Sequence, residues 1–434
     1  MKNLLVLLLV LPVLTFAQSV EGTFTPAEDY SYAFLYHATP ERANYIDRGQ
    51  LDAEGHFKID LDSTLTPGIY KIVYATPPEE NNFDFIYDGK EQVAFNFSLE
   101  KGVQFTISEE NKLWDSYLKS MEMINQTISN YYGKKNKDKK GFQAIFKTLK
   151  DTQTAYEELA EGKLVVRFIK ANRPYIPTDY EDISTYSKHL KAHFLSQVDF
   201  SDALLQSSSY LTDRVTAYVF NMVMNPDETV YKSHIDDVAL AIGNDDLPIK
   251  TSLLQMLWQT FVDLDHANMA NYITNTYLLE LAKQTKNIDL EEMLIAYKNT
   301  HIGALAPDFE IQLSDTKTSL HQLEGAKHYL LIFWSSTCSH CLNELPLVKK
   351  LVANHPELKV VAFGLENEKS HWEKEIKQYP MFIHTKGLNK WENPIVKTYG
   401  ISATPTYFLL DASKNIVAKP YNYEGLELAL KKLF

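Results

Sequence analysis

The sequence predicts a multidomain fold in three parts: an N-terminal all-β sandwich or barrel, a central α-helical region and a C-terminal α/β domain. The chain has 434 residues, and because a domain usually holds about 100 to 200 residues, about two to four domains are expected. The spacing of apolar residues changes from alternation to helical spacing, and then to strands that alternate with helices. With 45% hydrophobic and 23% charged residues, each part can bury a core.

Residues 1–17 have the pattern of a signal peptide. One positive charge, on Lys2, precedes an apolar run over residues 4–14, and small residues stand at Thr15 and Ala17 before the predicted cleavage site. The run is shorter than the roughly 20 residues that cross a bilayer, and the three-part pattern is that of a cleaved secretory signal. We therefore expect an exported protein that is soluble after cleavage, most simply in a periplasm.

Residues 18–107 predict the all-β domain. Short segments rich in aromatic and β-branched residues alternate between apolar and polar positions, as strands with one buried face do. The clearest segments are residues 32–36, 57–61, 69–74 and 93–97. Turn signals such as Pro67-Gly68 and Asp88-Gly89 separate them, so we expect an antiparallel sandwich or a small barrel.

Residues 108–301 predict the helical region, because their apolar residues recur at helical spacing. Examples of this spacing are Leu113, Leu118, Met121, Leu253, Leu254, Leu257 and Phe261. Pro174 and Pro177 interrupt the pattern near its first third, since proline breaks a helix interior. We expect several packed helical hairpins here.

Residues 302–434 predict the α/β domain. The strand candidates are residues 329–334, 359–365, 381–384, 406–411 and 415–418, and the helix candidates are residues 340–354, 369–379, 393–399 and 424–434. Strands that alternate with helices favour a sheet with a parallel portion, covered by helices on both faces.

Charge and cysteine content narrow the classes of function. The net charge of -13 argues against nucleic acid as a partner, because that binding needs clustered cations. The chain has two cysteines, Cys338 and Cys341. A disulfide that closes so small a loop removes little entropy from the unfolded chain, so reactivity explains the pair better than stability does.

The Cys338-Ser339-His340-Cys341 segment lies where an apolar strand meets a helix. The N-terminus of a helix stabilises a thiolate, which is the nucleophile in disulfide exchange. We predict that Cys338 attacks and that Cys341, one turn deeper, resolves the mixed disulfide. A partly protonated imidazole on His340 would lower the pKa of Cys338.

A metal site is the other use of a CxxC pair. The chain lacks a second cysteine pair, which rules out an all-cysteine zinc site, whereas a site completed by two histidines stays open. We predict neither a metal nor a cofactor.

Four segments together resemble the TlpA/ResA-type branch of the thioredoxin superfamily. They are Gly303 to Phe309 (GALAPDF), Phe333 to Cys341 (FWSSTCSHC), Glu344-Leu345-Pro346, and Ala403 to Asp411 (ATPTYFLLD). The resemblance implies a thioredoxin fold and an exported reductant of disulfides in other exported proteins, supplied with electrons by an unidentified membrane donor. The first 300 residues resemble the N-terminal extensions of thioredoxin-like proteins from Bacteroidetes-type bacteria.

The resemblance also implies roles for individual residues. It assigns Thr404 and Pro405 to the cis-proline loop that faces the disulfide and binds an extended substrate, and it places Trp334 with the substrate-binding residues. Glu344 matches the acidic residue of this branch. Because Ile332 stands where many thioredoxins carry a buried Asp, Glu344 is expected to accept the proton of the resolving cysteine.

Two other functions compete with the reductant. The segment Ala306 to Phe309 also occurs in peroxiredoxins. Before its reactive cysteine that family places a Pro, where this chain has Leu331, and then a Thr or Ser, where this chain has Ser335. Half of the peroxidatic pattern is therefore missing. A binding module with a thioredoxin scaffold is the second alternative, and it describes the N-terminal extension better than the C-terminal domain.

Overall fold

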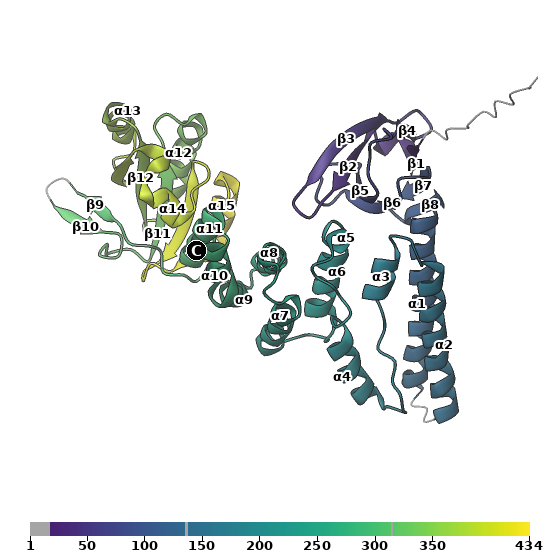
Figure 1. Cartoon of the computed structure of the whole chain (residues 1–434). Coiled ribbons are helices and arrows are strands. Elements are labelled where there is room, and N and C mark those ends of the chain that lie inside the picture. Colours follow the sequence, from purple (N-terminus) through teal and green to yellow (C-terminus); the bar gives the residue numbers. More distant parts are fainter. Residues whose placement is uncertain (1–17, 135–137, 314–315) are drawn as a thin grey trace, which may run out of the picture. The chain divides into compact units, whose positions relative to one another are not determined.

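The computed structural model describes residues 18–134, 138–313 and 316–434, so the predicted signal peptide lies outside the described residues. The chain divides between Leu253 and Leu254 into two units (Figure 1). The proposed domain limits at 107/108 and 301/302 stay predictions.

Eight strands of the first unit form a β-sandwich. They are β1 (Ser19–Thr25), β2 (Tyr32–Ala38), β3 (Ala43–Gln50), β4 (His56–Asp60), β5 (Gly68–Val73), β6 (Asn82–Tyr87), β7 (Val93–Ser98) and β8 (Gly102–Ile107). One sheet has the order β4-β1-β7-β8 and the other β3-β2-β5-β6. Neighbouring strands are antiparallel except β1 and β7, which are parallel. The all-β prediction is confirmed.

Inward side chains of both sheets share one aromatic core. Phe83 of β6 stacks on Phe97 of β7, with ring centroids 5.6 Å apart. Strand β4 shows how alternation produces this core, because Phe57 and Ile59 are buried while the three residues around them are exposed. Offset aromatic pairs add to the free energy that burial of their area contributes.

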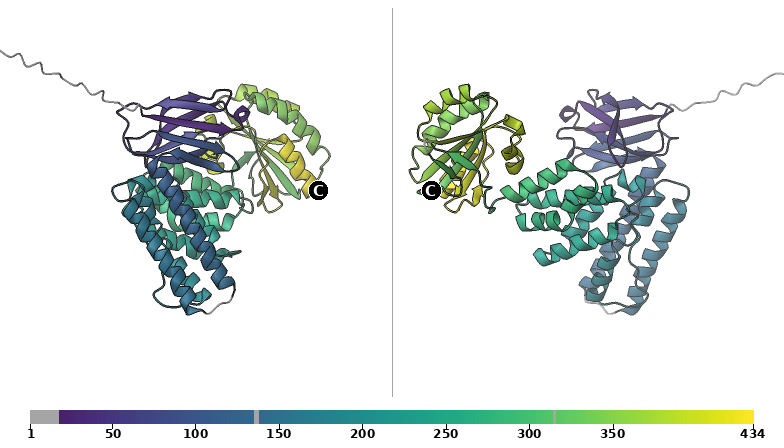
Figure 2. Two further views of the ribbon diagram at one scale, coloured as in Figure 1. Left: turned by 90° about the vertical axis from the view of Figure 1, so that its right-hand side faces the viewer. Right: turned by 60° about the vertical axis from the view of Figure 1, so that its left-hand side comes forward.

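The helices of the first unit follow the sandwich, with α1 and α2 running side by side as a long pair (Figure 2). They are α1 (Glu109–Gly133), α2 (Lys139–Leu159), α3 (Val166–Ala171), α4 (Ile183–His193), α5 (Ala203–Gln206), α6 (Tyr210–Thr216) with the π-helical η2 (Ala217–Asn221), and α7 (Glu228–Ile242). Helix α8 (Leu247–Asp263) crosses the division between the units. The central helical region is confirmed.

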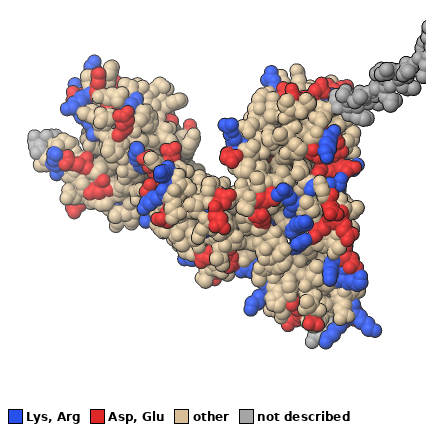
Figure 3. Space-filling view, viewed as in Figure 1, with Lys and Arg blue, Asp and Glu red and all other residues tan. Residues whose placement is uncertain are grey.

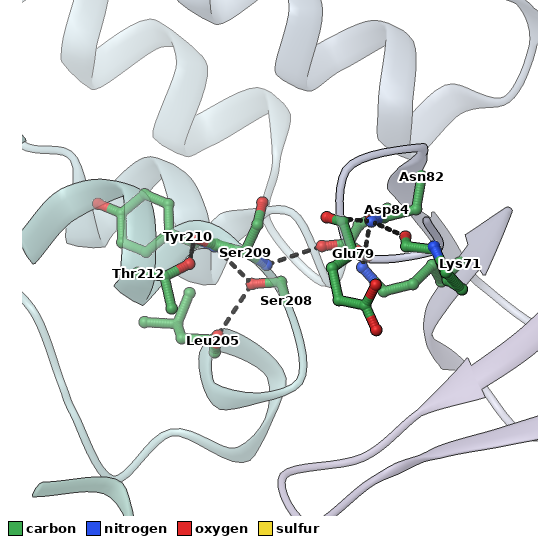
Figure 4. Close-up of polar contacts among 10 residues, drawn as sticks. Lys71, Glu79, Asn82, Asp84, Leu205, Ser208, Ser209, Tyr210 and Thr212 are labelled. Carbon is green, nitrogen blue, oxygen red and sulfur yellow. Dashed lines mark hydrogen bonds and ion pairs between the residues drawn. The ribbon is translucent and has the colours of Figure 1, made fainter. Parts of the chain in front are cut away.

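Polar side chains join the sandwich to these helices. The Asn111 side chain accepts a hydrogen bond from the Ile86 N–H at 2.8 Å and donates to the Ile86 carbonyl at 2.7 Å, so α1 occupies the edge of β6. The Asp84 carboxylate accepts from the Ser209 N–H at 2.7 Å and pairs with Lys71 (Figure 4). Edge strands need such partners because their backbone groups are otherwise unpaired.

Four helical segments follow α8 in the second unit, and the last of them, α11, packs against the α/β part. They are α9 (Ala267–Ile273), the π-helical η3 (Thr274–Leu278), α10 (Leu279–Gln284) and α11 (Ile288–Thr300). Glu292 of α11 pairs with Lys397 of α14 (Pro394–Tyr399) at 2.5 Å. Gly400 ends α14 with a φ of +62°, and a Cβ there would lie 3.1 Å from the Cβ of Ala296. Glycine suits this contact because it adopts positive φ without a steric cost.

A five-stranded mixed sheet is the centre of the second unit. Its strands are β11 (His328–Trp334), β12 (Leu358–Glu366), β13 (Ile383–Leu388), β14 (Thr406–Asp411) and β15 (Ile416–Ala418), in the order β13-β12-β11-β14-β15. Strands β11, β12 and β13 are parallel, whereas β14 and β15 run antiparallel to their neighbours. A separate hairpin of β9 (Glu310–Gln312) and β10 (Lys317–Ser319) was not predicted.

Helices cover both faces of this sheet, as predicted. Helices α12 (Ser339–Val352), α13 (Lys369–Glu375) and α15 (Tyr423–Leu433) share a core with Ile332, and α14 packs on the opposite face with Phe333. The alternation along β11 therefore divides its side chains between two cores.

Short 3-10 turns lie at η1 (Ala27–Asp29), η4 (Ile376–Gln378) and η5 (Lys390–Glu392).

In the described ranges, the helices do not resemble membrane spans, and the surface charges are mixed. None of the helices there combines the length and the apolar character that a membrane span requires. On the face drawn in Figure 3, acidic and basic side chains are interspersed over each unit.

Candidate active site

The two cysteines lie at the start of α12, directly after the buried strand β11. Cys338 is the N-cap of α12, and its Sγ accepts a hydrogen bond from the Cys341 N–H at 3.4 Å. The same sulfur lies 3.2 Å from the Thr404 carbonyl oxygen, to which it donates. Both cysteines are free thiols; Cys338 is partly exposed and Cys341 is fully buried.

The pKa values of the two thiols are shifted in opposite directions. Burial raises the pKa of Cys338, but hydrogen bonds with the side chains of Cys341 and Thr404 and with the backbone N–H groups of Cys341 and His340 outweigh burial and leave the pKa below that of an ordinary thiol. Burial, followed by hydrogen bonding with Cys338, raises the pKa of Cys341 to about 12. A partly exposed thiol with a lowered pKa beside a buried thiol with a raised pKa is the pair that disulfide exchange requires.

The loop before β14 completes the front of the site. The peptide bond between Thr404 and Pro405 is cis, as the resemblance implies. The Thr404 carbonyl faces the sulfur of Cys338. The structure therefore brings together four of the residues expected from the sequence, namely Cys338, Cys341, Thr404 and Pro405.

Glu344 lies one helical turn beyond Cys341 and has a partner that sequence reasoning missed. Its Oε2 accepts a hydrogen bond from the Tyr407 hydroxyl at 2.7 Å. Tyr407 is 1% exposed, and it is the cross-strand partner of Ile332 on the antiparallel pair β11 and β14. The available signal was its place in the predicted strand 406–411, because alternate residues of a strand share one face and Leu409 lies in the same core.

A second missed residue, Glu366, anchors the loop that precedes Cys338. Glu366 ends β12 and is 2% exposed, and its carboxylate accepts from the Ser336 N–H at 2.6 Å and from the Ser336 hydroxyl at 2.8 Å. Lys390 binds the same loop through the Thr337 hydroxyl at 3.0 Å. An acidic residue at the end of a largely apolar strand was the signal, since buried carboxylates need hydrogen-bond donors.

Two predicted site residues are placed differently from the others. Trp334 was assigned to substrate binding, but its side chain is fully buried in the core shared with Leu345 of α12, so it supports the site from below and offers no surface to a substrate. His340 is exposed, and its backbone N–H contributes to the lowered pKa of Cys338. The role predicted for its imidazole stays a prediction.

In the described ranges, no three His, Cys, Asp or Glu residues cluster as metal ligands would.

We expect iodoacetamide to modify Cys338 long before Cys341 in the reduced protein. At pH 7 a thiol with a pKa of about 12 is ionised to only about 10⁻⁵, whereas the lowered pKa of Cys338 brings its reactivity to a plateau at lower pH than an ordinary cysteine reaches. Peptide mapping after timed labelling between pH 5 and 9 measures both rates. Faster labelling of Cys341 would reverse the assigned roles.

Comparisons with known proteins match this domain. Residues 325–417 match the Thioredoxin-like family. The chain is 34% identical over 120 residues to "Thioredoxin-like protein YneN" of Bacillus subtilis, covering 25% of this chain and 65% of that protein. It is 30% identical over 142 residues to "Thiol-disulfide oxidoreductase ResA" of Bacillus thuringiensis subsp. konkukian, covering 30% of this chain and 78% of the relative.

Two solved structures are also similar. A domain of a possible thiol-disulfide isomerase from Cytophaga hutchinsonii is 28% identical, with a TM-score of 0.27, and covers 30% of this chain and 92% of its own. A thioredoxin-like protein from Bacteroides caccae is 20% identical, with a TM-score of 0.38, and covers 60% of this chain and 97% of its own. By its similarity to ResA, the chain belongs to the thioredoxin-like thiol-disulfide oxidoreductases, a family of enzymes, and carries their domain at its C-terminal end.

Proposed function

We propose that this protein is exported to the periplasm and reduces disulfides of other exported proteins through Cys338 and Cys341. The observation that carries the proposal is the asymmetry of the two thiols: Cys338 is partly exposed with a lowered pKa, and Cys341 is fully buried with a pKa raised to about 12. One sulfur can therefore reach a partner, and the other can react only with the first.

The reaction proceeds in two exchanges. The Cys338 thiolate attacks one sulfur of the substrate disulfide, so a mixed disulfide forms and the other substrate sulfur leaves as a thiolate. Cys341 then attacks Cys338, the Cys338–Cys341 bond forms, and the second substrate sulfur is released. Two electrons pass to the substrate, and a membrane donor of unidentified nature returns them to the cysteine pair.

The cis-proline loop supplies the surface for the substrate chain. The Thr404 carbonyl lies 3.2 Å from Cys338 Sγ, so a backbone that pairs with this loop in an extended form places its disulfide against the attacking sulfur. Main-chain pairing of this kind recognises a conformation and tolerates varied side chains. A reductant with several exported substrates fits such a surface.

The direction of electron flow is tested by the potential of the cysteine pair. Equilibration of the full-length protein with dithiothreitol buffers, followed by mass measurement of alkylated thiols, gives the potential. We expect a value near about -270 mV, which suits a reductant, together with reduction of insulin disulfides. A value near about -120 mV, or insulin reduction by the Cys338→Ala variant, would contradict the proposal.

A further inference from the structure

The hydroxyl of Tyr407 makes its hydrogen bond inside the site. The side chain is 1% exposed, and its ring packs in the same core as Cys341. Its hydroxyl donates to Glu344 Oε2 at 2.7 Å. The hydroxyl thus joins the sheet strand β14 to the redox helix α12.

Glu344 and Cys341 are neighbours on α12. Residues three apart lie on one face of a helix, with Cβ atoms about 5 to 6 Å apart. Glu344 is half-buried and is held from the sheet side by Tyr407. Because Tyr407 uses Oε2, Oε1 remains as the acceptor for a proton.

Burial and charge connect Tyr407 to both sulfurs. Burial raises the pKa of Tyr407 far above its usual range, and the hydrogen bond to Glu344 and the charges on Glu344, Cys341 and Cys338 add to the rise. The hydroxyl therefore keeps its proton through the reaction and acts as a fixed donor to Glu344. A fixed donor orients a carboxylate, as supporting hydrogen bonds do in other sites.

Cys341 needs such an acceptor because it is fully buried. Its thiol must lose a proton before it can attack the mixed disulfide. A positioned carboxylate speeds such a proton transfer by about 10² to 10⁴. The position that carries a buried Asp in many thioredoxins is Ile332 here, so the acceptor has to come from another element, and α12 with β14 supplies it.

We propose that Tyr407 is the positioning residue for the proton acceptor of Cys341, holding Glu344 through Oε2 so that Oε1 takes the thiol proton. This inference rests on the proposed function. In the resolving step the proton passes from Cys341 Sγ to Glu344, and the Cys341 thiolate forms the bond to Cys338. The Cys338–substrate bond breaks, and the departing substrate thiolate takes the proton from Glu344.

Tyr407→Phe in the full-length protein tests the role, because it removes the hydroxyl and keeps the ring. Rapid mixing with a disulfide-linked peptide, acid quenching and mass analysis separate formation of the mixed disulfide from its resolution. We expect attack by Cys338 to be unchanged and resolution to slow about tenfold at pH 7. The pH profile of the resolution rate should change as well, because the hydroxyl that holds the acceptor in place is gone.

A double-mutant cycle separates positioning from a purely structural role. Glu344→Gln removes the acceptor itself, so it should slow resolution about a hundredfold. Adding Tyr407→Phe to Glu344→Gln should then cost nothing more, because both changes remove one coupled unit. Tyr423→Phe is the matched control: this tyrosine packs beside the same core from α15, and its loss of a hydroxyl should leave the profile unchanged.

The outcomes distinguish this inference from the proposed function. If the wild-type protein forms no mixed disulfide, the proposed function fails. If the wild-type protein resolves the mixed disulfide and Tyr407→Phe shows the same rate and the same pH profile, Tyr407 has no positioning role. A slower rate with an unshifted profile, or additive losses in the double variant, would equally overturn the inference.

Discussion

Cys341→Ala is expected to convert a transient mixed disulfide into a stable complex with substrate proteins. The variant keeps the attacking sulfur of Cys338 and the backbone N–H groups that help to lower its pKa, and it removes the sulfur that resolves the mixed disulfide. Expression in an envelope-bearing host, alkylation of free thiols and non-reducing electrophoresis should show complexes that dithiothreitol dissolves. Mass spectrometry of the released partners should identify exported cysteine-bearing proteins.

Cys338→Ala is the matched control for this experiment. The sulfur that remains is fully buried, and burial is the largest cause of its raised pKa, so this sulfur has poor access to a substrate and little thiolate at neutral pH. We expect it to trap far less than Cys341→Ala does. Equal trapping by both variants would contradict the division of labour between the thiols, and trapping by neither would favour the binding-module reading.

The order of the longer elements could be read from the sequence because they have a clear hydrophobic period. The strand predicted at 406–411 coincides with β14, and that predicted at 359–365 lies within β12. The third strand of that sheet was displaced: it was expected at 381–384 and is found at Ile383–Leu388, with Met381 left exposed. Three-residue strands such as β9 are too short for a period-two signal.

Pairing between distant strands was beyond the sequence pattern. Alternation shows which face of a strand is buried, but it does not show the neighbour of that strand. The parallel pairing of β1 with β7 inside an otherwise antiparallel sandwich was therefore missed. The hydrogen bonds between Asn111 and the edge of β6 were missed for the same reason, because they depend on where α1 starts in space.

In the site, too, the sequence revealed residues that are close along the chain and missed residues that meet only in the fold. Cys338 and Cys341 were identified because spacing along one helix start is local. Tyr407 and Glu366 were missed because they act across the sheet, through contacts with Glu344 and Ser336. Trp334 was misplaced because its position in a motif gives no information that β11 is buried on both faces.

Glu366→Leu is expected to free the loop that carries Cys338. Leucine fills a similar volume but accepts no hydrogen bond, so the N–H and hydroxyl of Ser336, which is 6% exposed, lose their acceptor. A buried donor without a partner costs about 1 to 3 kcal/mol, and relief from burying a carboxylate offsets part of this cost. We expect local opening at Ser336 to become easier by about 2 kcal/mol, which is about thirtyfold faster amide exchange.

Two further substitutions serve as controls for this prediction. Glu366→Gln keeps an oxygen for the Ser336 N–H, so its amide exchange should stay within about fivefold of the wild type. Glu368→Leu changes an exposed residue two positions on and should leave Ser336 protected. Hydrogen exchange measured by mass spectrometry on peptides that span 335–338 reports the opening, and the rate of mixed-disulfide formation reports its effect on Cys338. Wild-type protection of Ser336 in Glu366→Leu would show that the loop is held by other contacts, such as the one between Lys390 and Thr337.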